Sequence, residues 1–320
     1  MHTEIAINEV KNCFENKLSE ALNLIKVSTP LVLSEGNGIN DNLNGEERIV
    51  SFDALDIKHK QIEVVQSLAK WKRMALGRYG FTIGEGLYTN MNAIRRDEVL
   101  DNLHSMYVDQ WDWEKVISKE QRNLDTLKSE VKKIYEAIKM TEEYMYEFHS
   151  ELEPVLPNDI YFISAQELEI MFPQLNPKER EDAITKEHGA VFIMQIGDVL
   201  ASGEKHDGRS PDYDDWTLNG DINVWNPVLE RAFELSSMGI RVDEHSLLKQ
   251  LKIANNEDRA VLQYHKSLLD GKLPYTIGGG IGQSRLCMFL LKKVHIGEVQ
   301  ASVWNDQIIK ECQESNITLL

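Results

Sequence analysis

Residues 276–286 carry four glycines within five positions, and Arg285 follows three residues after the last of them. Glycines lack a Cβ atom and let the backbone pass close beneath a bulky ligand. A helix starting after them would offer free N–H groups and a positive dipole to an anion, and an arginine there could pair with phosphate or stack on a base. The pattern suggests a nucleotide site at Gly280, Gly282 and Arg285. It fits equally a tight strand-to-helix turn in which the glycines only allow close packing.

The glycine spacing differs from the common phosphate-binding motifs. It is neither the G-x-G-x-x-G of dinucleotide sites nor the Gly-Lys-Ser/Thr of P-loops. It resembles the third signature motif of class II aminoacyl-tRNA synthetases, Gly-x-Gly-x-Gly-x-x-Arg, in which the arginine contacts ATP. In this chain the motif reads Gly278, Gly280, Gly282 and Arg285.

Further blocks, collinear with this motif, resemble ammonia-dependent asparagine synthetase and reach from near the N-terminus to Trp304. They read NDNL at 40–43, VVQSLAKWKR at 64–73, GEGLYT at 84–89, YVDQWDWE at 107–114, PDYDDW at 211–216, NGD at 219–221, VWNPVLE at 224–230 and ELSSMGIRV at 234–242. Together these blocks are far more specific than any single motif. The resemblance implies an α+β fold of the class II synthetase catalytic type, with a largely antiparallel sheet flanked by helices, as a single domain over residues 1–320.

The resemblance also implies a two-step reaction. The β-carboxylate of L-aspartate attacks the α-phosphorus of ATP, giving aspartyl-adenylate and pyrophosphate. Ammonia then attacks the activated carbonyl, giving asparagine and AMP. ATP is the expected co-substrate and Mg²⁺ the expected cofactor. Because class II catalytic domains pair, a homodimer is expected, with the N-terminal helix and the strand after it at the interface.

The first step brings two anions together and needs a cation between them. The resemblance assigns this role to Arg95, which matches the arginine of the second synthetase motif and whose planar fork can bridge carboxylate and phosphate. Gln110 could donate its amide N–H to the reacting carbonyl, and Arg285 should hold the nucleotide. Asp221 and Glu234 are candidate Mg²⁺ ligands, since hard cations take carboxylate oxygens and substrate phosphates. Without the resemblance, both fit ordinary strand-edge charges equally well.

Aspartate needs an acceptor for its amino group and a cation for its α-carboxylate. The resemblance places these tasks on polar residues of the matching blocks: Ser67, Lys72, Asp112, Asp214, Ser237 and Arg241. Asp41 could bind ammonium or take a proton from the attacking ammonia. As part of Asp-Asn-Leu-Asn-Gly, Asp41 is also a natural turn residue. The chain departs from the pattern of ammonia-dependent asparagine synthetase at two places. Gln66 occupies the place of an expected histidine, and the segment from 216 to 219 is shorter than in that family.

Composition limits the partners. The formal net charge of −17 argues against a broad phosphate-binding face, so no nucleic-acid partner is expected. No apolar run reaches the roughly 18 residues of a membrane span, and the N-terminus lacks a signal-like apolar region. Three cysteines in the sequence are few and odd in number, as is typical of free thiols in a reducing cytoplasm. A cytoplasmic enzyme without membrane partners is therefore expected.

Hydrophobic periodicity predicts the elements that must position these residues. A helical stripe near the N-terminus is formed by Val10, Phe14, Leu18, Leu22 and Ile25. Strands are expected over 27–33, 48–52, 62–65, 86–95, 104–114, 161–163, 191–196, 221–225 and 233–242. Helices are expected after Ser67 as N-cap, over 118–148, after the capping box at Ser164, from Pro177 to Gly189, up to about residue 254, and over 286–291.

The expected hairpin of strands 86–95 and 104–114 places polar side chains on one face. Period-two geometry groups Arg95 with Met91 and Ala93, and Gln110 and Asp112 with Met106 and Val108. Trp111 and Trp113 would then point to the opposite face, into the core. Polar groups at the end of an otherwise apolar face are typical of the floor of a site.

Three other functions remain open to test. A synthetase paralogue could adenylate aspartate and pass it to tRNA or another carrier; the acidic charge and the lack of a recognisable tRNA-binding segment count against it. A non-catalytic paralogue would be expected to lose some of Arg95, Asp221, Glu234 and Arg285, and all four are present. A glutamine-dependent enzyme would need a nucleophile for a glutaminase reaction, and Cys13 falls within the predicted N-terminal helix.

Overall fold

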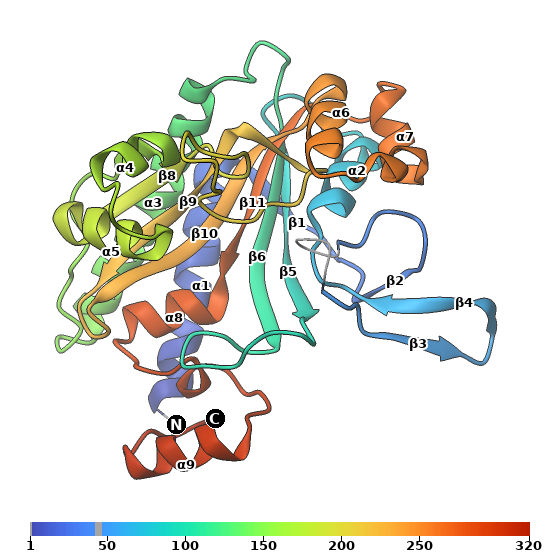
Figure 1. The fold of residues 1–320 in the computed structure, drawn as a ribbon. Coiled ribbons are helices and arrows are strands. Elements are labelled where there is room, and N and C mark those ends of the chain that lie inside the picture. Colours follow the sequence, from blue (N-terminus) through green and yellow to red (C-terminus); the bar gives the residue numbers. More distant parts are fainter. Residues whose placement is uncertain (1, 42–46) are drawn as a thin grey trace.

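The protein, described here from a computed structural model that covers residues 2–41 and 47–320, is built on a central eight-stranded sheet (Figure 1). The strand order is β1-β5-β6-β11-β10-β9-β8-β7, and only the outer pairs β1/β5 and β7/β8 are parallel. These strands are β1 (Leu24–Lys26), β5 (Gly86–Ile94), β6 (Tyr107–Val116), β7 (Tyr161–Ser164), β8 (Ala190–Met194), β9 (Asp214–Asn226), β10 (Arg231–Arg241) and β11 (Thr276–Gly282). The expected largely antiparallel sheet with flanking helices is confirmed.

One face of the sheet is covered by long apolar helices. The helices of the chain are α1 (His2–Leu22), α2 (Ala69–Tyr79), α3 (Leu124–Phe148), α4 (Ala165–Met171), α5 (Pro177–His188), α6 (Glu244–Ile253), α7 (Gln263–Leu269), α8 (Gln283–Leu290) and α9 (Asp306–Glu314), with 3₁₀ turns η1 (Glu257–Val261) and η2 (Ile296–Glu298). Helices α1, α3 and α8 share one hydrophobic core with the sheet. Phe14 of α1 packs on Trp111 with ring centroids 4.7 Å apart, and Trp113 is fully buried beside them. Both tryptophans thus belong to the core, as predicted.

Among the described residues, helices cover the opposite face only at its ends. Helix α2 packs its Ala75 and Leu76 on Leu87 and Val116 of β5 and β6. Helices α4 and α5 pack on β7 and β8 at the other end. A broad surface over β6, β11, β10 and β9 lies between these two groups, and it carries the polar residues discussed below.

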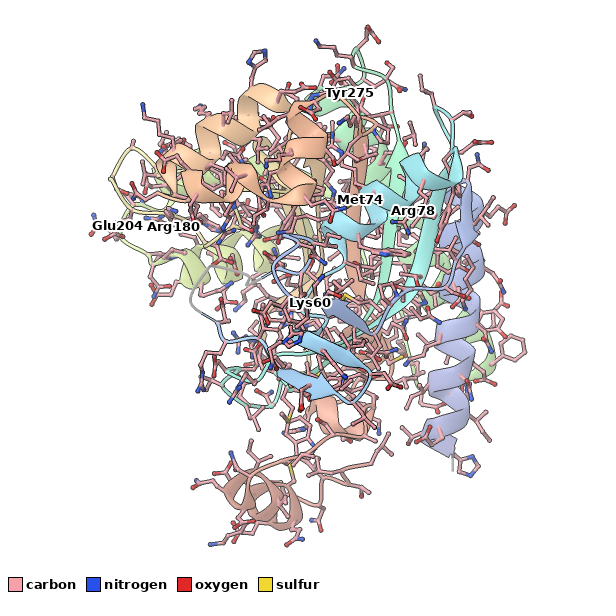
Figure 2. All side chains as sticks on the ribbon, turned by 90° about the vertical axis from the view of Figure 1, so that its right-hand side faces the viewer. Lys60, Met74, Arg78, Arg180, Glu204 and Tyr275 are labelled. Carbon is pink, nitrogen blue, oxygen red and sulfur yellow. The ribbon has the colours of Figure 1, made fainter. Side chains whose placement is uncertain are left out.

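A smaller three-stranded sheet projects from the body on the side of α2 (Figure 1). It has the order β2-β4-β3, formed by β2 (Val32–Ser34), β3 (Ser51–Ala54) and β4 (Ile57–Val64). Figure 2 views the molecule from this side, with Lys60 of β4 in front and Met74 and Arg78 of α2 above it.

Local signals located most element ends correctly. Ser164 and Asn176 form capping boxes at the starts of α4 and α5, and α5 ends at Gly189. Other bounds were wrong: the strand expected over 27–33 forms only at Val32–Ser34, the strand expected over 221–225 begins at Asp214, and the helix expected from residue 118 begins at Leu124. Ile25 lies on β1 with 61% of its surface exposed, because α1 ends at Leu22. Leu68, not Ser67, is the N-cap of α2, although the Ser67 hydroxyl still accepts a hydrogen bond from the N–H of Ala69 (3.2 Å).

Candidate active site

One row of paired residues crosses the exposed part of the sheet. Asp112 on β6 pairs with Gly280 on β11, Gly280 with Ser237 on β10, and Ser237 with Asp221 on β9. Directly paired residues point to the same face of a sheet. Four predicted site residues from four strands therefore meet on one face, the face that α1 and α3 leave free.

The glycines of the motif lie inside strand β11, and α8 begins only at Gln283. Of the two interpretations of the glycines, the tight strand-to-helix turn is therefore wrong, because the glycines themselves are strand residues. Gly278, Gly280 and Gly282 alternate along the strand, so all three face the same side as Asp112. A Cβ atom at Gly280 would collide with the side chains of Gln110 and Asp112. The bare strand leaves the space in which these neighbouring polar side chains lie.

A cavity of about 500 Å³ opens over this row. The predicted site residues on its wall are Ser67, Lys72, Arg95, Gln110, Asp112, Asp214, Glu234, Ser237, Arg241, Gly280, Gly282 and Arg285. Asp41 and Asp221 lie just behind the wall, next to Ser210 and Arg209, which do line the cavity. Residues distant in sequence are thus brought to one site.

Buried ion pairs form one end of the cavity. The guanidinium of Arg241 donates to Glu114 (2.7 Å) and pairs with Asp214, its register partner on β9. The ammonium of Lys72 lies 3.2 Å from Asp112 and donates to the carbonyl of Gly279 (3.0 Å). This end offers cations and carboxylates side by side, which suits a small zwitterion such as an amino acid.

The pKa values reflect this crowding of charges. Burial raises the pKa of Asp214, against the effect of Arg241. Burial, helped by the charge of Arg241, lowers the pKa of Lys72. For Glu114 burial acts in the opposite direction, yet Arg241 and Lys72 together lower its pKa. Glu114 therefore stays ionised and holds the two cations in place.

Several buried polar atoms at the site have no hydrogen-bond partner among the described residues. They are Arg95 Nε, Asp112 Oδ2, Asp221 Oδ1 and Asp41 Oδ2. Buried polar groups in native proteins are nearly always paired, so such a cluster calls for an explanation. All four belong to residues predicted to bind substrate or metal, and bound ligands would satisfy them.

Arg285 lies in the first turn of α8, at the other end of the cavity. Its guanidinium donates to the carbonyl of Glu234 (3.1 Å), and its carbon centre lies 6.0 Å from the ring centroid of Phe233. These contacts hold the guanidinium plane at the cavity wall, where it can stack on a base or pair with phosphate.

Asp41 is almost completely buried, with 1% of its surface exposed. The Ser210 hydroxyl donates to its Oδ1 (3.2 Å), and the Lys70 ammonium lies 3.9 Å from the same oxygen. Burial raises the pKa of Asp41 to about 6, although Lys70 acts against this. The turn expected after Asp41 falls on residues 42–46, which lie outside the described residues.

The backbone next to Asp41 is fixed by two amide side chains. Asn40 accepts hydrogen bonds from the N–H groups of Asp41 (3.1 Å) and Gln66 (3.0 Å), and it donates to the carbonyl of Val64. Gln66 in turn donates to the carbonyl of Arg48 (3.1 Å). Gln66, at the place of an expected histidine, therefore ties neighbouring segments together behind the site.

A β-bulge brings Glu234 to the same face as Asp221. The pairing of β10 with β9 shifts between Glu234 and Ser236, so Glu234 pairs with Asn223 while Ser237 pairs with Asp221. Burial raises the pKa of Asp221 to about 6, with Glu234 adding to the effect and Arg209 opposing it. Among the described residues, no three His, Cys, Asp or Glu side chains are grouped to hold a metal ion by themselves.

Some residues at the site were not foreseen as such. Arg209 pairs with Asp221, Glu114 holds Arg241 and Thr276, and Ser210 contacts Asp41. Arg209 and Ser210 lie in the loop before β9, directly ahead of the PDYDDW block. An arginine between Gly208 and a proline-containing acidic run was the available signal. Its partner on β9 could not be identified without the packing of the loop.

Solved structures with a similar fold include asparaginyl- and aspartyl-tRNA synthetases. The asparaginyl-tRNA synthetase of Pyrococcus horikoshii, complexed with asparaginyl-adenylate, superposes with a TM-score of 0.68 at 16% identity, covering 95% of this chain and 71% of that one. The Entamoeba histolytica asparaginyl-tRNA synthetase gives a TM-score of 0.64 at 12% identity, covering 93% of this chain and 66% of that one, so this chain spans about two thirds of its length. These similarities define the class II synthetase catalytic fold.

Closer relatives identify the family. Residues 1–316 match the family model described as aspartate-ammonia ligase. The aspartate–ammonia ligase of Clostridium tetani is 64% identical over 318 residues, which is 99% of this chain and 93% of the relative. That of Fusobacterium nucleatum is 59% identical over 320 residues, 100% of this chain and 97% of the relative. The chain belongs to the aspartate–ammonia ligase family. Within the described residues, no helix has the length and apolar character that a membrane crossing requires.

Proposed function

We propose that this chain makes L-asparagine from L-aspartate, ammonia and ATP through a β-aspartyl-adenylate, with release of AMP and pyrophosphate. One observation carries the proposal. A single cavity joins a zwitterion-sized end, formed by Asp112, Asp214 and Arg241, to an end with the arginines Arg95 and Arg285. An amino acid at the first end and a nucleotide at the second would bring carboxylate and α-phosphate together.

In the adenylation step, Arg95 is the cation between the two reacting anions. A β-carboxylate oxygen bonds to the α-phosphorus while the bond to pyrophosphate breaks, and negative charge spreads over the phosphate oxygens. Arg95 lines the cavity with a buried Nε that has no partner among the described residues, so it is free to donate in this step. Arg285 holds the nucleotide. Lys72 and Arg241 face the α-carboxylate, while Asp112, Asp214, Ser67 and Ser237 accept from the amino group or orient it.

In the ammonia step, Asp41 receives the nitrogen substrate. The free Oδ2 of Asp41 can attract ammonium and accept one of the two protons that ammonium loses on becoming an amide. Nitrogen bonds to the carbonyl carbon as the bond from that carbon to the phosphate oxygen of AMP breaks, and the second proton leaves with the AMP phosphate or to water. Gln110, next to Gly280 and Gly282 at the cavity floor, donates to the carbonyl oxygen as it becomes negative.

The residues present fit a Mg²⁺ ion bound together with the nucleotide. Asp221 Oδ1 is buried without a partner among the described residues, and Glu234 lies on the same face across the bulge. These two carboxylates would hold the ion, with nucleotide phosphates completing its oxygen ligands. When bound, the ion neutralises phosphate charge.

Product analysis tests the proposed reaction. The full chain is incubated with aspartate, ATP, Mg²⁺ and ammonium, and asparagine and nucleotides are quantified. Asparagine with equal amounts of AMP is expected. ADP as the product, or equal asparagine from glutamine while free ammonia is removed, contradicts the proposal. An aspartate-adenylating paralogue would instead form AMP only when a carrier such as tRNA is supplied.

The enzyme is also proposed to be a cytoplasmic homodimer. Strand β1 and the segment that leads into and begins β2 expose Ile25, Leu31 and Val32, apolar side chains that a second copy could cover. Its three cysteines are all free, which suits a reducing compartment. A light-scattering mass near twice 36.7 kDa is expected, and a mass near the single-chain value at micromolar concentration contradicts the dimer.

A further inference from the structure

A buried cluster of charges lies behind Asp41, and the steps above do not use it. At its centre is Asp212, which is completely buried in the segment before β9. Lys70 of α2 donates to it (3.1 Å), Arg259 of η1 donates to it (3.2 Å), and His265 of α7 lies 2.9 Å away. Burial acts against ionisation, yet Lys70 and His265 hold the pKa of Asp212 well below its usual range. Lys70, Arg259 and His265 thus favour the ionised form of Asp212.

Two groups bridge Asp212 and Asp41. The Lys70 ammonium lies 3.1 Å from Asp212 but 3.9 Å from Asp41. The Ser210 hydroxyl lies 2.9 Å from Asp212 Oδ1 and 3.2 Å from Asp41 Oδ1. A hydroxyl has one hydrogen and can donate to only one of the two carboxylates at a time. Both bridging groups lie closer to Asp212, and Asp41 Oδ2 has no partner among the described residues.

We propose that Asp212 is a positioning residue for the ammonia step: by drawing Lys70 and the Ser210 hydrogen toward itself, it leaves Asp41 only partly neutralised by them, and the free oxygen of Asp41 then receives the nitrogen substrate. The proposal rests on the proposed function, in which Asp41 has that role. When Asp41 takes a proton, an N–H bond breaks and an O–H bond forms. The Ser210 hydroxyl then donates to Asp212 and can accept from Asp41, so this proton can stay on Asp41 while the second proton lost by ammonium leaves with the AMP phosphate or to water.

The groups around Asp41 predict in which direction each variant shifts the pKa of Asp41. Lys70 and Arg259 lower the pKa of Asp41, the Ser210 hydrogen bond lowers it, and Asp212 raises it. Tyr213 is also within reach of the charge of Asp41: burial and this charge raise the pKa of Tyr213 and keep it neutral. Removing the charge of Asp212 should lower the pKa of Asp41. Removing Ser210 or Arg259 should raise it.

The test uses the full chain and the variants Asp212→Asn, Ser210→Ala and Arg259→Gln. Aspartate-dependent ATP–pyrophosphate exchange reports adenylation, and kcat/KM for ammonium reports the second step across acidic to alkaline pH. Asp212→Asn should keep exchange within about threefold and lose about tenfold or more in kcat/KM for ammonium. As the pH is lowered, Asp212→Asn should lose its ammonium-dependent activity at a lower pH than the parent does. In the other two variants this acid-side loss should move to higher pH.

Ser202→Ala is the matched control, because its hydroxyl also donates to a carboxylate, that of Glu169 (2.6 Å), away from the site. It should leave the pH profile unchanged. Breaking a buried ion pair is strongly destabilising, so Asp212→Asn could fail to fold. In that case the test depends on Ser210→Ala and Arg259→Gln. If both lose ammonium-dependent activity at the same acidic pH as the parent, the proposal is overturned. Equal loss of exchange and synthesis in a folded Asp212→Asn also overturns it.

The results that would refute the proposed function differ from those that would refute the positioning role of Asp212. A parent enzyme that makes no asparagine, or an Asp41→Asn variant that keeps its full ammonia step, refutes the role of Asp41 itself. The positioning role alone is refuted by a different set of results. In that case the parent makes asparagine and Asp41→Asn loses the ammonia step, but the acid-side loss of activity stays at the parent's pH in Asp212→Asn, Ser210→Ala and Arg259→Gln.

Discussion

Replacing Asp41 by asparagine should separate the two half-reactions and also stabilise the protein. The asparagine side chain has the same shape, and its amide can donate to Ser210, whose hydroxyl then donates to Asp212. It can neither attract ammonium strongly nor accept a proton. Adenylation should therefore persist while asparagine formation falls about a hundredfold or more, the upper part of the range for loss of a general base.

The expected gain in stability follows from the pKa of Asp41. Burial raises this pKa from 3.8 to about 6, so the folded state binds the proton more tightly than the unfolded chain does. Stability is then lost as pH rises from the unfolded value through the folded one, at 1.36 kcal/mol per unit, or about 3 kcal/mol once the pH is above both values. Asparagine has no such cost. For a chain of this length the gain corresponds to roughly 4 °C in Tm.

Two assays check both halves of this prediction. ATP–pyrophosphate exchange without ammonium should stay within about threefold of the parent, and asparagine yield should collapse. The difference in unfolding free energy should be near its full value at alkaline pH and about half as large near pH 5, where the folded Asp41 is mostly protonated. Retained asparagine synthesis, or a lower Tm at alkaline pH, refutes the reasoning. Equal loss in both assays would place Asp41 in aspartate binding instead.

Three further perturbations test other parts of the site. Arg95→Lys keeps the charge but loses the planar fork, so pyrophosphate exchange should drop about a hundredfold, and near-normal exchange would remove Arg95 from adenylation. Gly280→Ala forces a Cβ against Gln110, so the free energy of unfolding should fall by about 1–3 kcal/mol and most activity should be lost. The control Gly77→Ala within α2 should leave activity intact. Equal behaviour of the two variants would contradict the close packing at Gly280. Glu114→Gln removes the anion that holds Arg241 and Lys72, so the KM for aspartate should rise about tenfold or more, and an unchanged KM would show that this pair does not shape the aspartate end.

Much of the scaffold could be predicted because its signals are local. The apolar stripe at Val10, Phe14 and Leu18 identified α1, and capping boxes identified the starts of α4 and α5. Errors occurred where a local pattern competed with the surroundings. Ile25 continues the helical spacing, yet α1 ends before it because the chain turns at Asn23, which has a left-handed φ of 57°, to pair β1 with β5.

The glycine motif shows the same limit. Four glycines before a helix read naturally as a turn, since glycine favours turns more than strands. In the folded protein they form the central strand β11, because Gln110 and Glu114 on the neighbouring strand need the space a Cβ would take. Residues of both neighbouring strands take the space that side chains on β11 would need: Gln110, Asp112 and Glu114 of β6, and Ser237 and Met238 of β10. Glu114 contacts Thr276 of β11 although 162 residues separate them in the chain, so no local pattern shows why this strand must be bare.

The sequence by itself determined the family resemblance, the α+β class and the identity of residues that could do the chemistry, because these depend on residue types and their order. Tertiary structure alone decided which of them meet. The bulge in β10 turns Glu234 toward Asp221, and the loop before β9 brings Arg209 and Ser210 to partners on other segments. It also decided their charge states. A carboxylate such as Asp41 acquires a raised pKa only when packing removes its water and sets Lys70 nearer to another anion, and no local pattern in the chain encodes that distance.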